Sequence, residues 1–322
     1  MLHTLWEWLP TVPEFVAGLT YVDREPFTYH MVTDGWVTEA DWALWKHRQV
    51  GGSGFFQHPS NIRMNLFAEL SEWTGDHWNV PFAVLAGYLA MIVVGPRLMA
   101  NREALPVHLL VCAWNWGLAL FSLCGMVTTW SAIIDLIASK GYEATVCGHP
   151  AFMAQSYVGV AMALFIYSKL AELIDTWFLV AKKSNVIFLH WYHHVTVLLY
   201  CWHSYSTRIT SGIWFAAMNY FVHAIMYAYF AMTQMGPRSR RMVRPYAQLI
   251  TTLQISQMFV GLLVNGSIIF YTSQGHRCKT NKTNTILSWL MYLSYFVLFG
   301  LLYLRNYIMG AAKPAGKRAK AE

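Results

Sequence analysis

Seven apolar runs constrain the fold of this chain more than any other feature of its sequence. A helix needs about 20 apolar residues to cross the hydrocarbon core of a bilayer, where every backbone polar group must be paired within the protein. Only 12% of the 322 residues are charged, against about 25% in soluble domains. We therefore predict an all-α membrane protein, a seven-transmembrane helix bundle. Its spans are expected at 79–95, 106–136, 151–180, 186–202, 212–234, 247–271 and 286–305.

Basic residues gather between alternate spans, which predicts the orientation of the bundle. Loops rich in Lys and Arg stay on the cytosolic side of a membrane, so we expect the N-terminus in the lumen and the C-terminus in the cytosol. The net charge of +7 then reflects this orientation rule, and no nucleic-acid-binding motif accompanies it. The clusters follow spans one, three, five and seven: Arg97 and Arg102; Lys182 and Lys183; Arg238, Arg240, Arg241 and Arg244; Lys313, Lys317, Arg318 and Lys320.

Two terminal segments flank the predicted bundle of residues 79–309. Residues 1–78 hold 10 of the 16 acidic residues but 4 of the 23 basic ones, and they are rich in Trp. Tryptophan and short amphipathic helices suit a membrane surface. We interpret residues 1–78 as an acidic lumenal extension at the interface, and residues 310–322 as a basic cytosolic tail.

Two of the five cysteines lie outside the predicted spans, and we expect them to form a disulfide. Cys147 falls between spans two and three, and Cys278 between spans six and seven. Both loops are lumenal under the predicted topology, where thiols oxidise. The second loop also contains Asn281-Lys282-Thr283, an N-glycosylation sequon. We predict Asn281 as a glycosylation site, with chance occurrence of a three-residue motif as the alternative.

Three histidines interrupt the fourth apolar run. His190, His193 and His194 stand at i, i+3 and i+4, so a helix places their imidazoles on one face. Polar side chains at membrane depth are costly and usually face the interior of a bundle or a water-filled cavity. The cluster therefore predicts a functional site rather than three packing histidines.

Spans three, five and six each add a stripe of polar residues at helical spacing. Such groups can serve merely as hydrogen-bonding glue between helices, at about 0.6 kcal/mol each. If they face inward with the histidines, they line one polar chamber, and an apolar tunnel leading from it suits a long acyl chain. The stripes are Lys169, Glu172, Asp175 and Thr176; Asn219, His223 and Tyr227; and Thr251, Gln254 and Gln257.

Together these residues resemble four motifs of the fatty-acid elongase (ELO) family. The segment 190–194 fits the family's HxxHH, 169–176 fits KxxExxDT, 219–229 fits NxxxHxxMYxY, and 251–257 fits TxxQxxQ. The chain looks most like the branch that extends saturated and monounsaturated long-chain acyl groups. Phe230 departs from the pattern, because the family often has a second Tyr there.

The resemblance implies an enzyme of the endoplasmic-reticulum membrane whose bundle encloses an acyl-chain tunnel. It would convert acyl-CoA and malonyl-CoA to 3-oxoacyl-CoA, carbon dioxide and CoA. No cofactor or metal is implied beyond these two substrates. The expected partners are membrane lipid and the 3-oxoacyl-CoA reductase, dehydratase and enoyl reductase of the elongation cycle.

Roles for the individual residues follow from this chemistry. We expect His193 to form an acyl-imidazole, because an unprotonated imidazole is nucleophilic, and His223 to act as base and enolate donor. We expect His190 and His194 to orient the reacting groups. The carboxylate of Asp175 or Glu172 is expected to fix the tautomer of a histidine. The groups expected to bind the thioester and pantetheine are Asn219, Tyr227, Gln254 and Gln257, with Thr176 beside them. Those expected to meet CoA phosphates are Lys169, Lys182, Lys183 and the Arg238–Arg244 cluster, which includes Arg244.

Two other functions remain compatible with parts of the sequence. A membrane di-iron desaturase or hydroxylase also carries HxxHH, and imidazole suits iron. Such an enzyme needs several histidine boxes, and this chain has one. A non-enzymatic seven-helix lipid carrier or receptor could also have four polar stripes, and a transport assay would separate it from a condensing enzyme.

Overall fold

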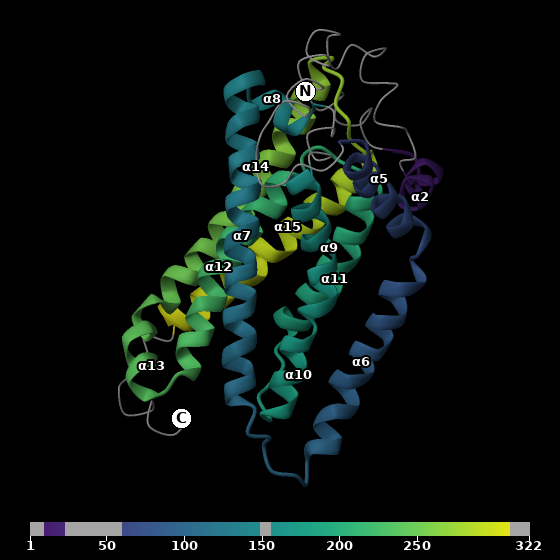
Figure 1. Ribbon diagram of the computed structural model, residues 1–322. Coiled ribbons are helices and arrows are strands. Elements are labelled where there is room, and N and C mark those ends of the chain that lie inside the picture. The colour runs from purple at the N-terminus through teal and green to yellow at the C-terminus, as the bar shows by residue number, and fades with distance from the viewer. Residues whose placement is uncertain (1–9, 23–59, 149–155, 310–322) are drawn as a thin grey trace.

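Helices make up every regular element of the described residues, which are 10–22, 60–148 and 156–309 of a computed structural model (Figure 1). The predicted basic tail and most of the predicted extension lie outside these ranges. The α-helices are α2 Val12–Thr20, α5 Ser60–Asp76, α6 Asn79–Met99, α7 His108–Lys140, α8 Tyr142–Val146, α9 Ser156–Ala171, α10 Ile174–Ala181, α11 Phe188–Ser206, α12 Gly212–Gln234, α13 Pro237–Val243, α14 Ala247–Ser273 and α15 Lys282–Tyr303. A 3₁₀ turn, η2 Arg244–Tyr246, precedes α14, and a π-helix, η3 Leu304–Met309, follows α15.

Among the described residues, five helical segments are long and apolar enough to cross a membrane, which confirms the all-α membrane architecture. They are Asn79–Met99, His108–Lys140, Tyr157–Ala181, Pro237–Ser273 and Lys282–Met309. The two other predicted spans form α11 and α12, of 19 and 23 residues. These helices carry the histidines and the Asn219 stripe, and such polar groups lower the mean hydropathy of a helix. The count of seven spans therefore stays a prediction.

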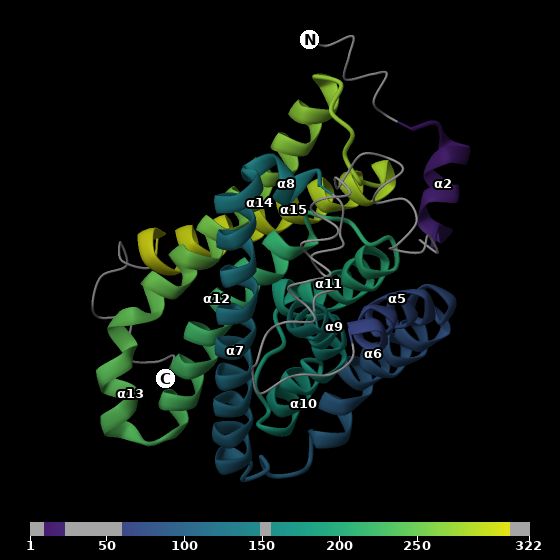
Figure 2. The ribbon, with the colours of Figure 1, turned by 45° about the horizontal axis from the view of Figure 1, so that its top comes forward.

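The long helices pack in pairs around α11. Helix α7 lies along α12, α14 lies along α15, and α11 contacts α5, α6, α9 and α15. Figures 1 and 2 show α13 and the end of α10 at one end of the bundle, opposite α2, α5 and α8. We call the first end, where Lys182 and Arg240 lie, the basic end, and the other the disulfide end.

The predicted third span is not one continuous helix. It breaks between α9 and α10, where Asp175 N donates to Glu172 O over 3.1 Å and Thr176 N donates to Leu173 O over 3.2 Å. These i→i+3 bonds make a turn tighter than an α-helix. The turn lies directly before Asp175 and Thr176, within the helical segment Tyr157–Ala181.

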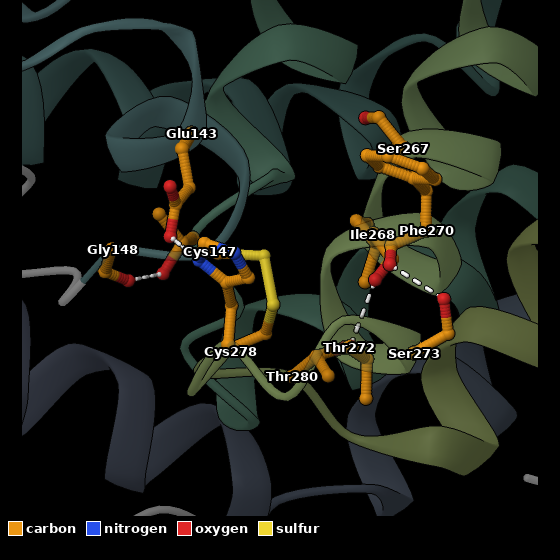
Figure 3. Close-up of a disulfide and its surroundings, with 12 residues drawn as sticks. Glu143, Cys147, Gly148, Ser267, Ile268, Phe270, Thr272, Ser273, Cys278 and Thr280 are labelled. Carbon is orange, nitrogen blue, oxygen red and sulfur yellow. Dashed lines mark hydrogen bonds and ion pairs between the residues drawn. A yellow bond between two sulfur atoms is a disulfide. The ribbon is translucent and has the colours of Figure 1, made fainter.

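Cys147 and Cys278 form a disulfide, as predicted (Figure 3). The bond joins the end of α8 to the loop between α14 and α15. Nearby, Lys279 N donates to Cys147 O over 3.1 Å, and His276 Nδ1 lies 2.6 Å from a carboxylate oxygen of Glu143. The covalent bond and these contacts close the disulfide end of the bundle.

The two described helices of the predicted extension pack against the bundle. Helix α5 contacts α9 and α11, and α2 contacts α15. Buried Arg208 donates to Ser71 Oγ over 2.6 Å and to Glu72 Oε1 over 2.9 Å. His203 Nε2 donates to Gly18 O over 2.9 Å, while its Nδ1 accepts from Asn284 Nδ2. These polar contacts join the extension to the helix that carries the histidine cluster.

Asn281, the predicted glycosylation site, makes hydrogen bonds within the fold. The side-chain oxygen Oδ1 of Asn281 caps α15 by accepting from Asn284 N over 3.1 Å, and Nδ2 of the same side chain donates to Gly18 O over 3.4 Å. Thr283, the third sequon residue, is buried and donates to Phe15 O. Glycosylation of Asn281 stays a prediction.

The disulfide is expected to stabilise the fold, since it links residues 131 positions apart. The chain-entropy model assigns a bridge of this span about 4–5 kcal/mol as an upper figure. Cys147→Ser should therefore lower the Tm of the protein in detergent, while Cys124→Ser, which changes an exposed free cysteine of α7, should not. Peptide mapping that finds Cys147 and Cys278 alkylated without prior reduction would contradict the bridge.

Candidate functional site

A cavity of about 530 Å³ brings the four predicted stripes together. Its volume falls in the range of about 300–1,000 Å³ that is typical of small-molecule sites. Much of the remaining wall is apolar, with Phe178, Leu189, Val222 and Phe299 among its residues. The predicted site residues that line the cavity are Glu172, Asp175, Lys182, His190, His193, His194, Asn219, His223, Tyr227, Gln254 and Gln257.

The three imidazoles of α11 form a close cluster on this wall. The ring centroids of His190 and His194 lie 4.6 Å apart, and those of His193 and His194 lie 5.7 Å apart. The Nδ1 atoms of His193 and His194 are buried and have no hydrogen-bond partner in the described part of the chain. Buried polar atoms are normally paired, so these two nitrogens are open to a partner that the described residues do not supply.

His190 is held by a hydrogen-bonded chain that joins two of the motifs to a residue outside them. Its Nε2 lies 2.8 Å from Thr176 Oγ1, which lies 2.9 Å from the hydroxyl of Tyr88 on α6. Thr176, which we expected beside the thioester-binding groups, therefore bonds a histidine of α11.

Asp175 bonds to two other helices instead of a histidine. Its Oδ1 accepts from Trp114 Nε1 of α7, and its Oδ2 accepts from the Tyr227 hydroxyl of α12, both over 2.7 Å. Of the two carboxylates expected to fix a histidine tautomer, Glu172 rather than Asp175 lies near a histidine nitrogen, His223 Nδ1. The Asp175 carboxylate lies between α7 and α12, where two neutral donors satisfy both of its oxygens.

Lys169 and Glu172 form a buried ion pair, and each is 2% exposed. Lys169 Nζ donates to Glu172 Oε1 over 2.7 Å and to Asn219 Oδ1 over 3.0 Å. The same carboxylate oxygen accepts from Ser168 over 3.1 Å and lies 3.9 Å from His223 Nδ1. Lys169 does not line the cavity, so this geometry gives no support to the predicted contact with CoA phosphates. Its ammonium group instead compensates the charge of Glu172.

The basic residues predicted to bind CoA phosphates at the end of the bundle differ in their contacts and in their access to the cavity. Lys182 lines the cavity and donates to Gln234 Oε1 over 3.0 Å, and burial, followed by the nearby charge of Arg240, lowers its pKa. Lys183 donates to the carbonyls of Ala100 and Arg102, so it fastens the loop between α6 and α7. Arg244 is exposed and lies outside the cavity wall. Of the three, Lys182 is the one placed to meet a ligand in the cavity.

Three residues outside the four motifs bond to motif residues from other helices: Tyr88, Trp114 and Tyr307. The Trp114–Asp175 bond joins residues 61 positions apart, and the Tyr88–Thr176 bond joins residues 88 apart. Local spacing contains no signal for such pairs. Within residues 10–22, 60–148 and 156–309, no group of three or more His, Cys, Asp or Glu side chains is placed to hold a metal ion.

Removing the ammonium group of Lys169 should destabilise the protein strongly. Lys169→Met leaves Glu172 as an uncompensated buried charge, which typically costs about 3–5 kcal/mol. We expect a marked fall in Tm in detergent, and partial recovery in Lys169→Met/Glu172→Gln. Lys140→Met serves as the control, because Lys140 is exposed at the end of α7. Equal Tm values for Lys169→Met and Lys140→Met would show that the buried pair contributes no stability.

Comparison with known proteins identifies the family of this chain. The model of the GNS1/SUR4 family (ELO) matches residues 73–315. Fatty acid elongase 3 of Trypanosoma cruzi is 38% identical over 282 residues, which cover 79% of this chain and 92% of that protein. Very long chain fatty acid elongase 6 of Gallus gallus is 39% identical over 253 residues (79% and 91%), and that of Homo sapiens 38% over 240 residues (74% and 89%). This chain therefore belongs to the GNS1/SUR4 (ELO) family.

Proposed function

We propose that this protein is the condensing enzyme of fatty-acid elongation, which joins acyl-CoA and malonyl-CoA to give 3-oxoacyl-CoA, carbon dioxide and CoA. Membership of the family and the elongase relatives support this acyltransferase activity. The observation that carries it is the convergence of His193, His223 and the amides of Gln254 and Gln257 on one cavity with a largely apolar wall. An apolar wall suits an acyl chain, and the polar groups suit a thioester.

His193 acts in this proposal as the nucleophile. An imidazole nitrogen attacks the thioester carbonyl, the bond to sulfur breaks, and CoA leaves with an acyl-imidazole remaining on the protein. The support is the position of His193 on the cavity wall and its buried Nδ1 with no partner in the described residues. Tyr295 donates to His193 O and packs against its ring at 4.9 Å, which keeps this turn of α11 in place.

His223 stabilises the second substrate. Malonyl-CoA loses carbon dioxide to form an enolate, which attacks the acyl carbonyl and releases His193. A donor aimed at the enolate oxygen lowers the barrier, as an oxyanion hole does. His223 lies on the cavity wall, its ring contacts Tyr227 at 5.2 Å, and its Nδ1 is 3.9 Å from Glu172. These neighbours orient the imidazole.

The CoA arm runs along α14 toward the basic end. Gln254 Nε2 has Met226 Sδ as its partner at 3.3 Å, and a thioether is a weak acceptor, so this amide is available for a pantetheine group. Lys182, at the basic end of the cavity, binds a CoA phosphate. Arg238, Arg240 and Arg241 of α13 add positive charge at the same end of the bundle.

We also infer how the enzyme is placed in the membrane. The basic end faces the cytosol, and the disulfide end faces the lumen of the endoplasmic reticulum. Asn281 is a lumenal glycosylation site. Product passes to the 3-oxoacyl-CoA reductase, dehydratase and enoyl reductase of the elongation cycle. Positive loops on one side and the lumenal chemistry of the disulfide support this orientation.

His193→Ala should abolish condensation measured with purified protein, labelled malonyl-CoA and a ladder of acyl-CoA chain lengths. Wild-type protein given acyl-CoA alone should release free CoA and show an acyl adduct, by mass spectrometry, on the peptide that contains His193. His203→Asn is the control on the same helix, because His203 bonds outside the cavity. More than a few per cent of wild-type activity in His193→Ala would remove His193 as the nucleophile.

Iron chelators should leave the condensation rate unchanged, because the reaction contains no redox step. The measurement is the same assay after incubation with chelator, and again after iron is added back. Loss of activity with chelator and recovery with iron would favour the di-iron alternative.

A further inference from the structure

The last described turn of α15 changes its hydrogen-bonding geometry. Residues Leu304–Met309 form the π-helix η3, in place of an ordinary α-helical end. π-Helical segments are rare and occur frequently at functional sites. Figure 2 shows this end of α15 beside α14, far from the disulfide end of the bundle. The π-helix contains one residue of the cavity wall, Tyr307.

Tyr307 lies on the cavity wall, well separated from the proposed nucleophile. Tyr295, which contacts His193, stands 12 positions earlier in the chain. The α-helical part from Tyr295 to Tyr303 spans roughly 12 Å at about 1.5 Å per residue, and Tyr307 lies beyond it toward the basic end. The cavity residues Phe299 and Leu302 lie between them in sequence, so one wall of the cavity runs continuously from His193 to Tyr307.

The Tyr307 hydroxyl has a weak partner. It lies 3.4 Å from Thr251 Oγ1, and the Thr251 hydroxyl itself donates to Ala247 O over 3.2 Å. Hydroxyl hydrogen bonds are usually about 2.7–2.8 Å long, so the Tyr307 proton can be given to a better acceptor at low cost. Thr251 also begins the stripe that continues through Gln254 and Gln257, all on the cavity wall.

Tyr303 provides an internal comparison. It lies one turn earlier, and its ring centroid is 5.1 Å from that of Tyr307. The Tyr303 hydroxyl accepts from Gln248 Nε2 over 2.8 Å. Neither Tyr303 nor Gln248 lines the cavity. The two tyrosines therefore share a helix end and a packing environment, but Tyr307 alone of the two reaches the cavity.

We propose that Tyr307 is a substrate-contact residue whose hydroxyl donates a hydrogen bond to the outer amide carbonyl of the pantetheine arm. This inference rests on the proposed condensing function. With the thioester at His193, the arm must extend along the wall that ends at Tyr307. Gln257 and Gln254 then face the inner part of the arm. Tyr307 contacts the outer amide, and Lys182 contacts the phosphates.

The test compares Tyr307→Phe with wild type on one acyl chain carried by three thiols: CoA, pantetheine and N-acetylcysteamine. Malonyl-CoA is held at saturation, and kcat/KM for the acyl thioester is measured. The CoA and pantetheine thioesters contain the outer amide, and the N-acetylcysteamine thioester lacks it. Loss of one neutral hydrogen bond should lower kcat/KM about 3- to 10-fold for the first two, and leave the third unchanged.

Tyr303→Phe is the matched control and should leave all three values unchanged. An equal loss for all three thioesters in Tyr307→Phe would assign Tyr307 a structural role and overturn the proposal. Unchanged kcat/KM for the CoA thioester would also overturn it. A wild-type protein that makes no 3-oxoacyl product would refute the condensing function itself, an outcome distinct from a loss confined to the Tyr307 variant.

Discussion

The buried ion pair of Lys169 and Glu172 is the interaction on which the site depends. Removing a carboxylate or an ammonium group from water costs several kcal/mol each, and only close pairing with further hydrogen bonds compensates that cost. Here Asn219 of α12 binds the ammonium and Ser168 binds the carboxylate. The pair therefore joins α9 to α12 at the level of the cavity, and it places a carboxylate 3.9 Å from His223.

The break that follows Glu172 distributes the next two polar side chains to four other helices. Asp175 bonds to α7 and α12, and Thr176 bonds to α6 and α11. These four bonds connect the third span to four other helices around the cavity. Among the catalytic candidates, His190 is hydrogen-bonded to Thr176, and His193 contacts Tyr295 of α15.

Much of the architecture could be predicted from the sequence, because the bilayer imposes strict rules on composition. Apolar runs of about 20 residues must be helices there, and residues such as His190, His193 and His194 at membrane depth indicate a polar interior. The disulfide between Cys147 and Cys278 followed from the loops that contain these cysteines. The same reasoning identified most of the side chains that line the cavity, since helical spacing of three and four defines a face.

The pairing of those side chains was decided by the tertiary structure alone. Lys169 fits the pattern of a phosphate-binding residue, yet it is buried against Glu172 and outside the cavity. Trp114 and Tyr307 belong to none of the four motifs, yet Trp114 bonds Asp175 and Tyr307 lies on the cavity wall. Helical spacing determines which residues share a face of one helix. Which faces meet, and at what depth, depends on packing between helices far apart in sequence, and no local pattern records it.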